Sequence, residues 1–200
     1  MATQQALDAL ERDFVRLGIM LSPQDWRGIC GRLTDLSFPS GQTIQNQAHV
    51  ANAWVFLVSG IAASEQTWDD GTTTIARFFL AGDFCANMTS AWTGDIASDD
   101  LIAITDVTGL SLPDSLFRPE YLSGGAFGTY LRIKAMETHL FDKELICAKT
   151  VGRSEIRYRF LEHYQADVIA RARQQDIARF MGVTPQGLSR FLRRRNRPTD

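Results

Sequence analysis

The sequence predicts an α+β protein in which an antiparallel β jelly roll precedes a long helix and a C-terminal helix-turn-helix. Residues 36–116 break into short stretches rich in Val, Ile, Thr, Phe and Trp that end at Gly, Asp, Asn or Pro. Apolar residues then recur at helical spacing, and the last thirty residues contain two short helical patterns around a tight turn. We expect three regions: a β-roll with leading helices at 1–118, a long helix at 119–150 and a helix-turn-helix at 151–200.

Two helices are expected before the β region. The first has apolar residues at helical spacing: Ala6, Leu7, Leu10 and Phe14. Ser22 and Pro23 have the cap and first-turn proline of a second helix, which we expect to reach about residue 33.

Turn signals divide the β region at short, irregular intervals, as expected for a jelly roll. They are Phe38–Gly41, Val58–Gly60, Asp69–Gly71, Ala81–Asp83 and Thr93–Asp95. After Pro119 and the pair Gly124–Gly125, a long helix is expected to end before Gly152. Its apolar residues at roughly helical spacing are Phe127, Leu131, Met136, Leu140, Leu145 and Ala148.

The C-terminal turn has the local chemistry of a helix-turn-helix. We expect Gly182 to end the first helix, Thr184 to cap the second and Pro185 to take its first position. The predicted buried residues are Ile177, Ala178, Met181, Leu188, Phe191 and Leu192. The outward face then holds Gln186, Gly187, Ser189, Arg190, Arg193 and Arg194, which suit contact with DNA.

The charge distribution also indicates DNA. Residues 151–200 hold eleven Arg and five acidic residues, a balance of +6. Residues 1–150 hold the remaining ten basic and eighteen acidic residues, a balance of −8, and the two add to the net charge of −2. A basic C-terminal module therefore follows an acidic region, and we expect only the basic part to touch double-stranded DNA.

Other classes of protein fit less well. The start of the chain lacks the pattern of a signal peptide, no apolar run is long enough to span a bilayer, and Cys30, Cys85 and Cys147 do not suggest a disulfide framework. We therefore expect a cytoplasmic protein without membrane contact. We predict no enzyme, catalytic residues or metal site, because His49 is the only histidine in the β region. A cupin-like β-barrel enzyme remains a weaker alternative.

Specific residues in this order resemble the CRP/FNR family of bacterial transcription regulators. They are Phe38, Gly41 and Ile44, the strand Val55–Gly60, the segment Gly82–Phe84, and Arg157, Phe160 and Leu161 before the helix-turn-helix. The resemblance implies a cyclic-nucleotide-binding-like β-roll, with RNA polymerase as a further partner. It also implies a homodimer formed through the long helix, with two recognition helices roughly 34 Å apart on a palindromic site.

By the same resemblance, Arg190 would read guanine, Gln186 adenine or cytosine, and Ser189 phosphate, with Thr184, Gly187, Arg193 and Arg194 completing the DNA-binding set. Gly187 departs from the family pattern because it costs about 1 kcal/mol of helix propensity relative to alanine. We expect the family's β-wing to be absent or vestigial after Arg197–Pro198. Its phosphate contacts would pass to Arg193, Arg194, Arg195 and Arg197.

The expected effector pocket follows from the family's nucleotide-binding cassette. Its candidate residues are Gly82, Asp83, Phe84, Cys85, Asn87, Met88 and Ser98. Asn87 stands near the family's glutamate and Ala97 near its arginine, and no basic residue lies between Arg77 and Arg118. We therefore expect that cyclic AMP does not bind.

Other effectors stay open. Haem bound through Cys85 is an alternative, although Asn87 stands where a histidine would be needed, and a buried thiol is the simpler interpretation. An apolar or aromatic effector against Phe78, Phe79, Phe84, Met88 and Trp92 is another, as is no ligand and no cofactor at all. A dimeric sensor or adaptor that has lost DNA binding is the main alternative function.

Overall fold

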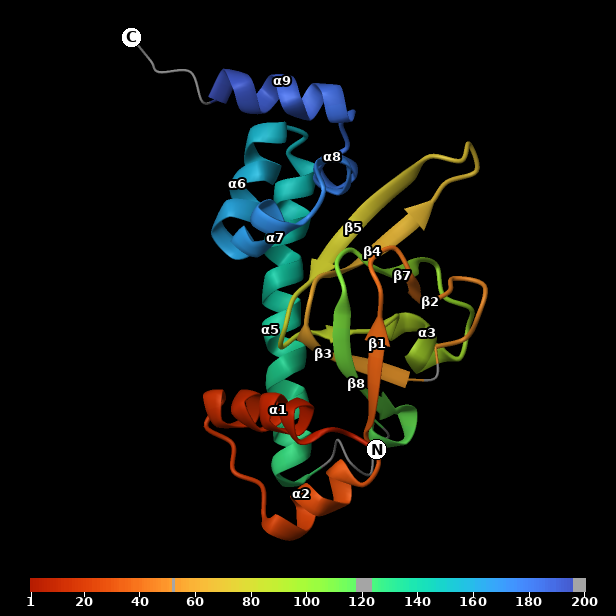
Figure 1. The fold of residues 1–200 in the computed structure, drawn as a ribbon, viewed down its shortest axis with the longest axis vertical. Helices are drawn as coiled ribbons and strands as arrows, with labels where there is room; N and C mark the ends of the chain where they lie inside the picture. The colour runs from red at the N-terminus through yellow and green to blue at the C-terminus, as the bar shows by residue number, and fades with distance from the viewer. Residues whose placement is uncertain (52, 118–123, 196–200) are drawn as a thin grey trace.

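Helix α5 (Gly125–Thr150) runs along the long axis of the molecule and connects its other parts (Figure 1). The computed structural model describes residues 1–51, 53–117 and 124–195. Helices α1 (Gln4–Arg16) and α2 (Pro23–Cys30) lie at one end of α5 and the strands along its side. At the other end lie α6 (Ser154–Tyr164), α7 (Ala166–Arg171), α8 (Gln174–Met181) and α9 (Pro185–Arg195).

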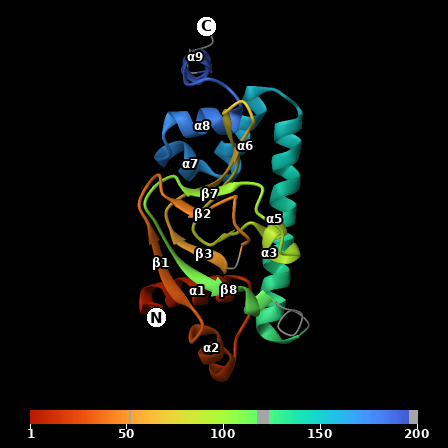
Figure 2. The same ribbon diagram turned by 90° about the vertical axis from the view of Figure 1, so that its right-hand side faces the viewer.

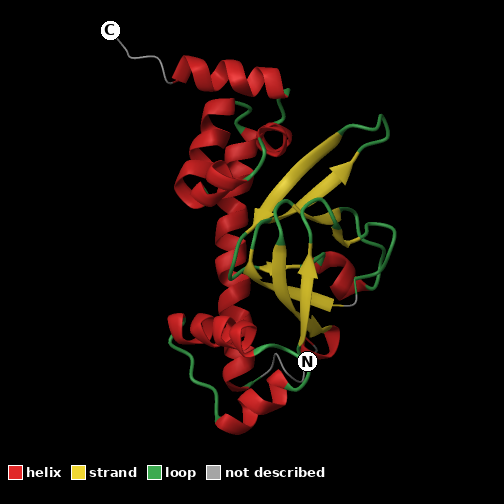
Figure 3. Ribbon diagram, in the orientation of Figure 1, coloured by secondary structure: helices red, strands yellow, loops and turns green. Residues whose placement is uncertain are grey.

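The strands of the described residues form two four-stranded antiparallel sheets, which confirms the α+β fold with a β-roll (Figure 3). One sheet has the order β1-β8-β3-β6 and the other β2-β7-β4-β5. Their bounds are β1 Thr34–Phe38, β2 Thr43–Gln45, β3 Ala53–Ser59, β4 Ala62–Thr67, β5 Thr73–Phe79, β6 Phe84–Cys85, β7 Asp100–Ala103 and β8 Val107–Pro113. A short helix α3 (Met88–Thr93) follows β6, and a 3-10 turn η1 (Asp114–Phe117) follows β8.

Strand β5 has buried side chains on both faces, and a β-bulge shifts its pairing with β4. Glu65 pairs with Ile75 but Ser64 pairs with Arg77, so Ala76 is the extra residue. Ile75 and Phe78 pack against the C-terminal helices, whereas Phe79 faces the core between the sheets. The outer face of the sheet that contains β5 is therefore covered by helices.

The C-terminal helices and the β-roll share one hydrophobic core. The rings of Phe78 on β5 and Phe180 on α8 lie 5.4 Å apart between centroids. Gln165, which is buried between α6 and α7, donates from Nε2 to the Phe78 carbonyl at 3.0 Å. Figure 2 shows α7 and α8 lying over this end of the β-roll.

The N-terminal helices pack on the first half of α5. Phe14 stacks on Tyr130 with ring centroids 3.8 Å apart, and the Tyr130 hydroxyl donates to Asp13 at 2.8 Å. Ser22 caps α2 ahead of Pro23, as predicted, and the structure adds Thr3 as the cap of α1. Helix α2 ends at Cys30, slightly earlier than expected, because residues 31–33 turn into β1.

The apolar residues of α5 divide between two faces rather than forming the single stripe that their spacing suggested. Phe127, Leu131, Leu145 and Ala148 are buried, because this face contacts α1, the β-roll and α6 in turn. Met136 and Leu140 lie on the opposite face and are 58% and 56% exposed. Helix α5 thus keeps an apolar surface that nothing in the protomer covers among the described residues.

Candidate nucleic-acid interface and effector cavity

The turn between α8 and α9 is held by three local interactions. Gly182 ends α8 in the left-handed region at φ 65°. The Thr184 hydroxyl accepts a hydrogen bond from the Gly187 amide at 3.1 Å, and Pro185 is the first residue of α9. These predicted roles are confirmed, and they fix the angle at which α9 leaves the body.

The two helices bury one face each and expose the other. Ile177, Ala178, Met181 and Leu188 are buried, while Phe191 and Leu192 are half-buried. On the opposite side Thr184, Gln186, Arg190, Arg193 and Arg194 are exposed, and Gly187 and Ser189 are half-buried. The structure therefore brings all seven predicted DNA-binding residues to α9 and its cap.

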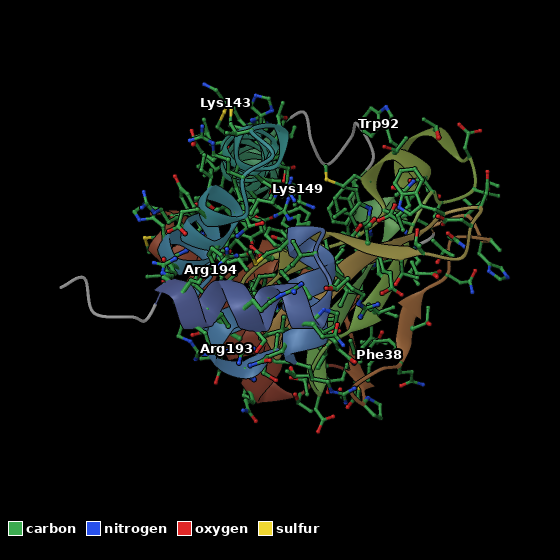
Figure 4. All side chains as sticks on the ribbon, turned by 90° about the horizontal axis from the view of Figure 1, so that it is seen from above. Phe38, Trp92, Lys143, Lys149, Arg193 and Arg194 are labelled. Atoms are coloured by element: carbon green, nitrogen blue, oxygen red, sulfur yellow. The ribbon has the colours of Figure 1, made fainter. Side chains whose placement is uncertain are left out.

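Helix α9 lies across one end of the molecule, where Arg193 and Arg194 are labelled in Figure 4. Within the described ranges, no ion pair joins Arg190, Arg193 or Arg194 to an acidic side chain. A helix face with three such arginines presents positive charge toward solvent. This arrangement suits a polyanion.

Arg195 differs from its neighbours and corrects one expectation. Its guanidinium lies 2.6 Å from a Glu162 oxygen and 3.4 Å from a Glu155 oxygen, and it stacks over the Tyr158 ring at 4.9 Å. Arg195 thus faces back onto α6 instead of offering its charge to phosphate. Residues 197 and 198, to which the remaining expectation and the missing wing refer, lie outside the described residues.

A groove of about 930 Å³ separates α9 from the start of α6. It is lined by Arg190, Arg193 and Arg194 and, on the α6 side, by Arg153 and Ser154. Arg153 was not predicted as a site residue; it is the N-cap residue of α6, at the end of the helix that attracts anions. The cationic surface is therefore broader than α9 alone.

Gly187 has a structural role in the turn. A Cβ atom at this position would lie 3.2 Å from the Thr184 hydroxyl oxygen and 3.7 Å from the Val183 Cβ. The first distance is tighter than ordinary contact, so a side chain here would crowd the cap of α9. Glycine keeps that cap and leaves the groove open beside Arg190.

The end of α5 is tied to both the β-roll and α8. Lys149 donates to the Ile75 carbonyl at 2.8 Å and lies 4.6 Å from the centre of the Phe180 ring. Arg157 donates to the Met181 carbonyl and, at 3.4 Å, to the Lys149 carbonyl. Burial, and to a lesser degree the nearby Arg157 charge, lowers the pKa of Lys149 to about 8.

This shift predicts a pH-dependent stability. Because burial disfavours the ammonium only in the folded state, the unfolded chain keeps the proton up to about pH 10.4, and stability rises from pH 8 toward that value. We expect Lys149→Met to lose about 2 kcal/mol of this rise, less than the full linkage value because the ammonium is only partly buried. Urea unfolding of both proteins at pH 7 to 10 measures it. Lys143→Met, at an exposed position of α5, is the control. If the free energy of unfolding changed with pH equally in the parent and in Lys149→Met, the prediction would be contradicted.

A cluster of ion pairs joins β4 to α8. Arg179 of α8 pairs with Glu65 of β4 and, at 2.6 Å, with Asp176. A further donor of Arg179 reaches the Thr73 hydroxyl at 3.4 Å. The first helix of the helix-turn-helix is thus bound to the β4–β5 strand pair by charge as well as by the Phe78–Phe180 contact.

The effector cavity lies between the β-roll and α5 and measures about 280 Å³. Four predicted residues line it: Phe84, Asn87, Met88 and Ser98. The structure places the other three elsewhere. Asp83 accepts from the Leu80 amide at 2.8 Å in the β5–β6 turn, Gly82 accepts from Lys134, and Cys85 is fully buried. Burial raises the pKa of the Cys85 thiol, so this group packs as an apolar side chain.

Arg77 brings a cation into the effector cavity, contrary to the expectation of a cavity without basic residues. Its guanidinium lies 2.6 Å from Asp142 of α5 and 4.8 Å from the ring centres of Phe79 and Phe141. Ser64, the cross-strand neighbour of Arg77, donates to Asp99. The cavity thus contains one arginine and two aspartates, and its arginine already has a carboxylate partner.

Comparison with known proteins agrees with this geometry. Residues 35–121 match the cyclic nucleotide-binding domain family. FixK2 from Bradyrhizobium japonicum is 18% identical with a TM-score of 0.61, over 81% of this chain and 83% of that one. A transcriptional regulator of the CRP/FNR family from Eubacterium rectale has a TM-score of 0.64 at 16% identity, over 87% and 83%.

The fold is that of the CRP/FNR family. The resemblance seen in the sequence is therefore confirmed. The c-di-GMP-responsive regulator CLP of Xanthomonas campestris also shares the CRP/FNR fold, with a TM-score of 0.61 at 16% identity over 86% of this chain and 91% of that one. No curated protein matches the chain in sequence. Across the described ranges, no helix is long and apolar enough to cross a bilayer.

Proposed function

We propose that this chain is a sequence-specific DNA-binding transcription regulator that acts as a homodimer. The observation that carries the proposal is the exposed arginine face of α9, set by a capped turn in a chain with the CRP/FNR fold. In this function residues 1–118 are the sensor, 119–150 the dimerisation helix and 151–200 the DNA-binding region.

Each part of the cationic surface has a role in this proposal. Arg190 pairs with a guanine edge, and Gln186 reads a neighbouring base. Arg193, Arg194 and Arg153 hold phosphates on either side of the groove, and Ser189 adds a hydroxyl.

The direct test is selection of bound sequences from a random DNA pool by the purified protein without ligand. Enrichment of a palindrome supports the proposal, and no enrichment favours a dimeric sensor that no longer reads DNA.

The exposed face of α5 supports the homodimer. Met136, Leu140, Lys143 and Cys147 follow one another at spacings of four, three and four residues, and all are exposed. This is the spacing of a two-helix seam in which equivalent residues of two copies meet. A two-fold axis along such a seam would place both α9 helices at the same end of the dimer.

Cys147 offers a test of that seam. If two α5 helices pair in parallel, the two Cys147 thiols meet, and mild oxidation should link most of the protein as a disulfide dimer within minutes. Non-reducing electrophoresis measures the linked fraction. Cys147→Ser should abolish it, since Cys85 is buried and Cys30 half-buried. Glu144→Cys in the Cys147→Ser protein is the matched control, and cross-linking there equal to that of Cys147 would contradict the seam.

We further propose that cyclic AMP is not the effector. Arg77 is held by Asp142, and Asp99 adds negative charge, so a cyclic phosphate has no unpaired cation among the described cavity residues. Calorimetric titration of the parent should give no saturable heat up to about 1 mM nucleotide. Asp142→Asn, which removes the carboxylate from Arg77, should gain measurable affinity. Tight binding by the parent that depends on Ser98 would contradict the prediction.

A further inference from the structure

A second, more apolar cavity of about 180 Å³ lies beside the effector cavity, between α3, η1, strands β3 and β6, and α5. We call it the aromatic cavity. Its apolar walls are Trp54, Phe84, Met88, Trp92, Phe117 and Leu131. Phe78 and Phe79 were expected to join this set, but Phe78 packs under α8 and Phe79 lines the effector cavity.

The walls of the aromatic cavity are mostly rings in fixed contact. Trp54 stacks on Phe117 with centroids 4.0 Å apart, and it meets Phe84 edge-on at 6.4 Å. Lys134 also lines the cavity, but its ammonium donates to the Gly82 carbonyl at 2.8 Å and lies 3.3 Å from Asp13. The lysine therefore offers its methylene stem here rather than a free charge.

Two features of the aromatic cavity lack an explanation within the protomer. The Nε1 donor of Trp54 is buried and has no hydrogen-bond partner in the described part of the chain. Trp92, labelled in Figure 4, is 71% exposed although it borders the cavity, and Met88 beside it is 45% exposed. Exposed apolar side chains at the rim of an apolar cavity mark a binding site.

We propose that the aromatic cavity binds a neutral molecule with a single aromatic ring. Its volume exceeds the roughly 150 Å³ that suffices for benzene in an apolar protein cavity. Ring walls favour an aromatic guest through edge and stacking contacts, and a charged guest would lose hydration without gaining a partner. The guest would join α3 to α5, independently of any DNA binding.

The test is a titration of the full chain with fluorobenzene, followed by ¹⁹F NMR without DNA. We expect saturable binding with a dissociation constant on the order of 1 mM or tighter. Trp92→Ala and Met88→Ala should each weaken binding at least about fivefold, because each removes part of the rim. Trp68→Ala is the matched control: this tryptophan is 50% exposed but lies in the β4–β5 hairpin just after the end of β4, and its loss should leave binding unchanged. Thermal unfolding verifies that all variants are folded.

Three results would overturn the proposal. One is the absence of saturable binding to the full chain, and another is equal weakening by Trp68→Ala and Trp92→Ala. The third is binding that emerges only in Leu140→Glu, a change on the exposed face of α5 that separates two copies. That last result would mean that a side chain of a second copy fills the aromatic cavity.

Discussion

Replacing Arg190 with alanine is expected to abolish the enrichment of a palindrome from random DNA and to weaken binding to the parent's site on the order of 100-fold or more. One bidentate arginine–guanine contact is worth about 1–3 kcal/mol, and a homodimer loses two of them. Arg190 is exposed on α9, so its loss removes no buried contact and should leave the thermal unfolding temperature unchanged. Selection and fluorescence anisotropy measure the two effects.

Arg195→Ala is the matched control for this experiment. It removes the same charge from the same helix, but Arg195 is paired with Glu155 and Glu162 and stacks on Tyr158. We expect the selected sequence to stay the same and the affinity to fall less than about threefold. Arg193→Ala should instead weaken all sequences alike and reduce the salt dependence of binding. An unchanged motif in Arg190→Ala would show that α9 does not read bases through this residue.

Phe78→Ala is expected to destabilise the protein by about 3–5 kcal/mol, the cost of emptying a fully buried phenylalanine site. For a chain of this size the unfolding temperature should fall by roughly 10 °C. Because Phe78 packs on Phe180 across the boundary between β-roll and α8, the damage should reach both sides. Hydrogen exchange should therefore accelerate in β5 and α8 together.

The same substitution at Phe38 provides the comparison. Phe38 lies at the end of edge strand β1, is half-buried and packs only against the core between the sheets. Phe38→Ala should cost less than about 2 kcal/mol and leave exchange in α8 unchanged. If Phe78→Ala accelerated exchange in β5 alone, α8 would not depend on the β-roll for its stability.

Local features of the fold could be predicted from sequence because neighbouring residues determine them. Gly182, Thr184 and Pro185 lie within four positions of one another, and their turn forms as expected. The same holds for the cap at Ser22 and the first-turn proline Pro23. Each of these signals needs one hydrogen bond or one backbone conformation, which a short segment supplies by itself.

Long-range features could not be predicted in this way. Arg77 reaches the effector cavity only because the bulge at Ala76 sets the register of β5, and its partner Asp142 lies on a helix sixty-five residues later. The ion pair between Arg195 and Glu162 forms only when α6 and α9 pack against each other. The spacing of the apolar residues also could not show which of them are buried on α5, because burial depends on which other elements pack against each face of the helix.

The bulge in β5 limits the insertions and deletions that this strand can accept. Residues on one side of the strand border the effector cavity, and those on the other side hold α8. Inserting or deleting a single residue in β5 would exchange these sides, moving Arg77 toward α8 and Phe78 toward the cavity. The length of this strand is therefore constrained by two parts of the molecule at once. Point substitutions at Arg77 or Phe79 would change the lining of this cavity alone, whereas an insertion or deletion between Ile75 and Phe79 would also disturb the packing of α8.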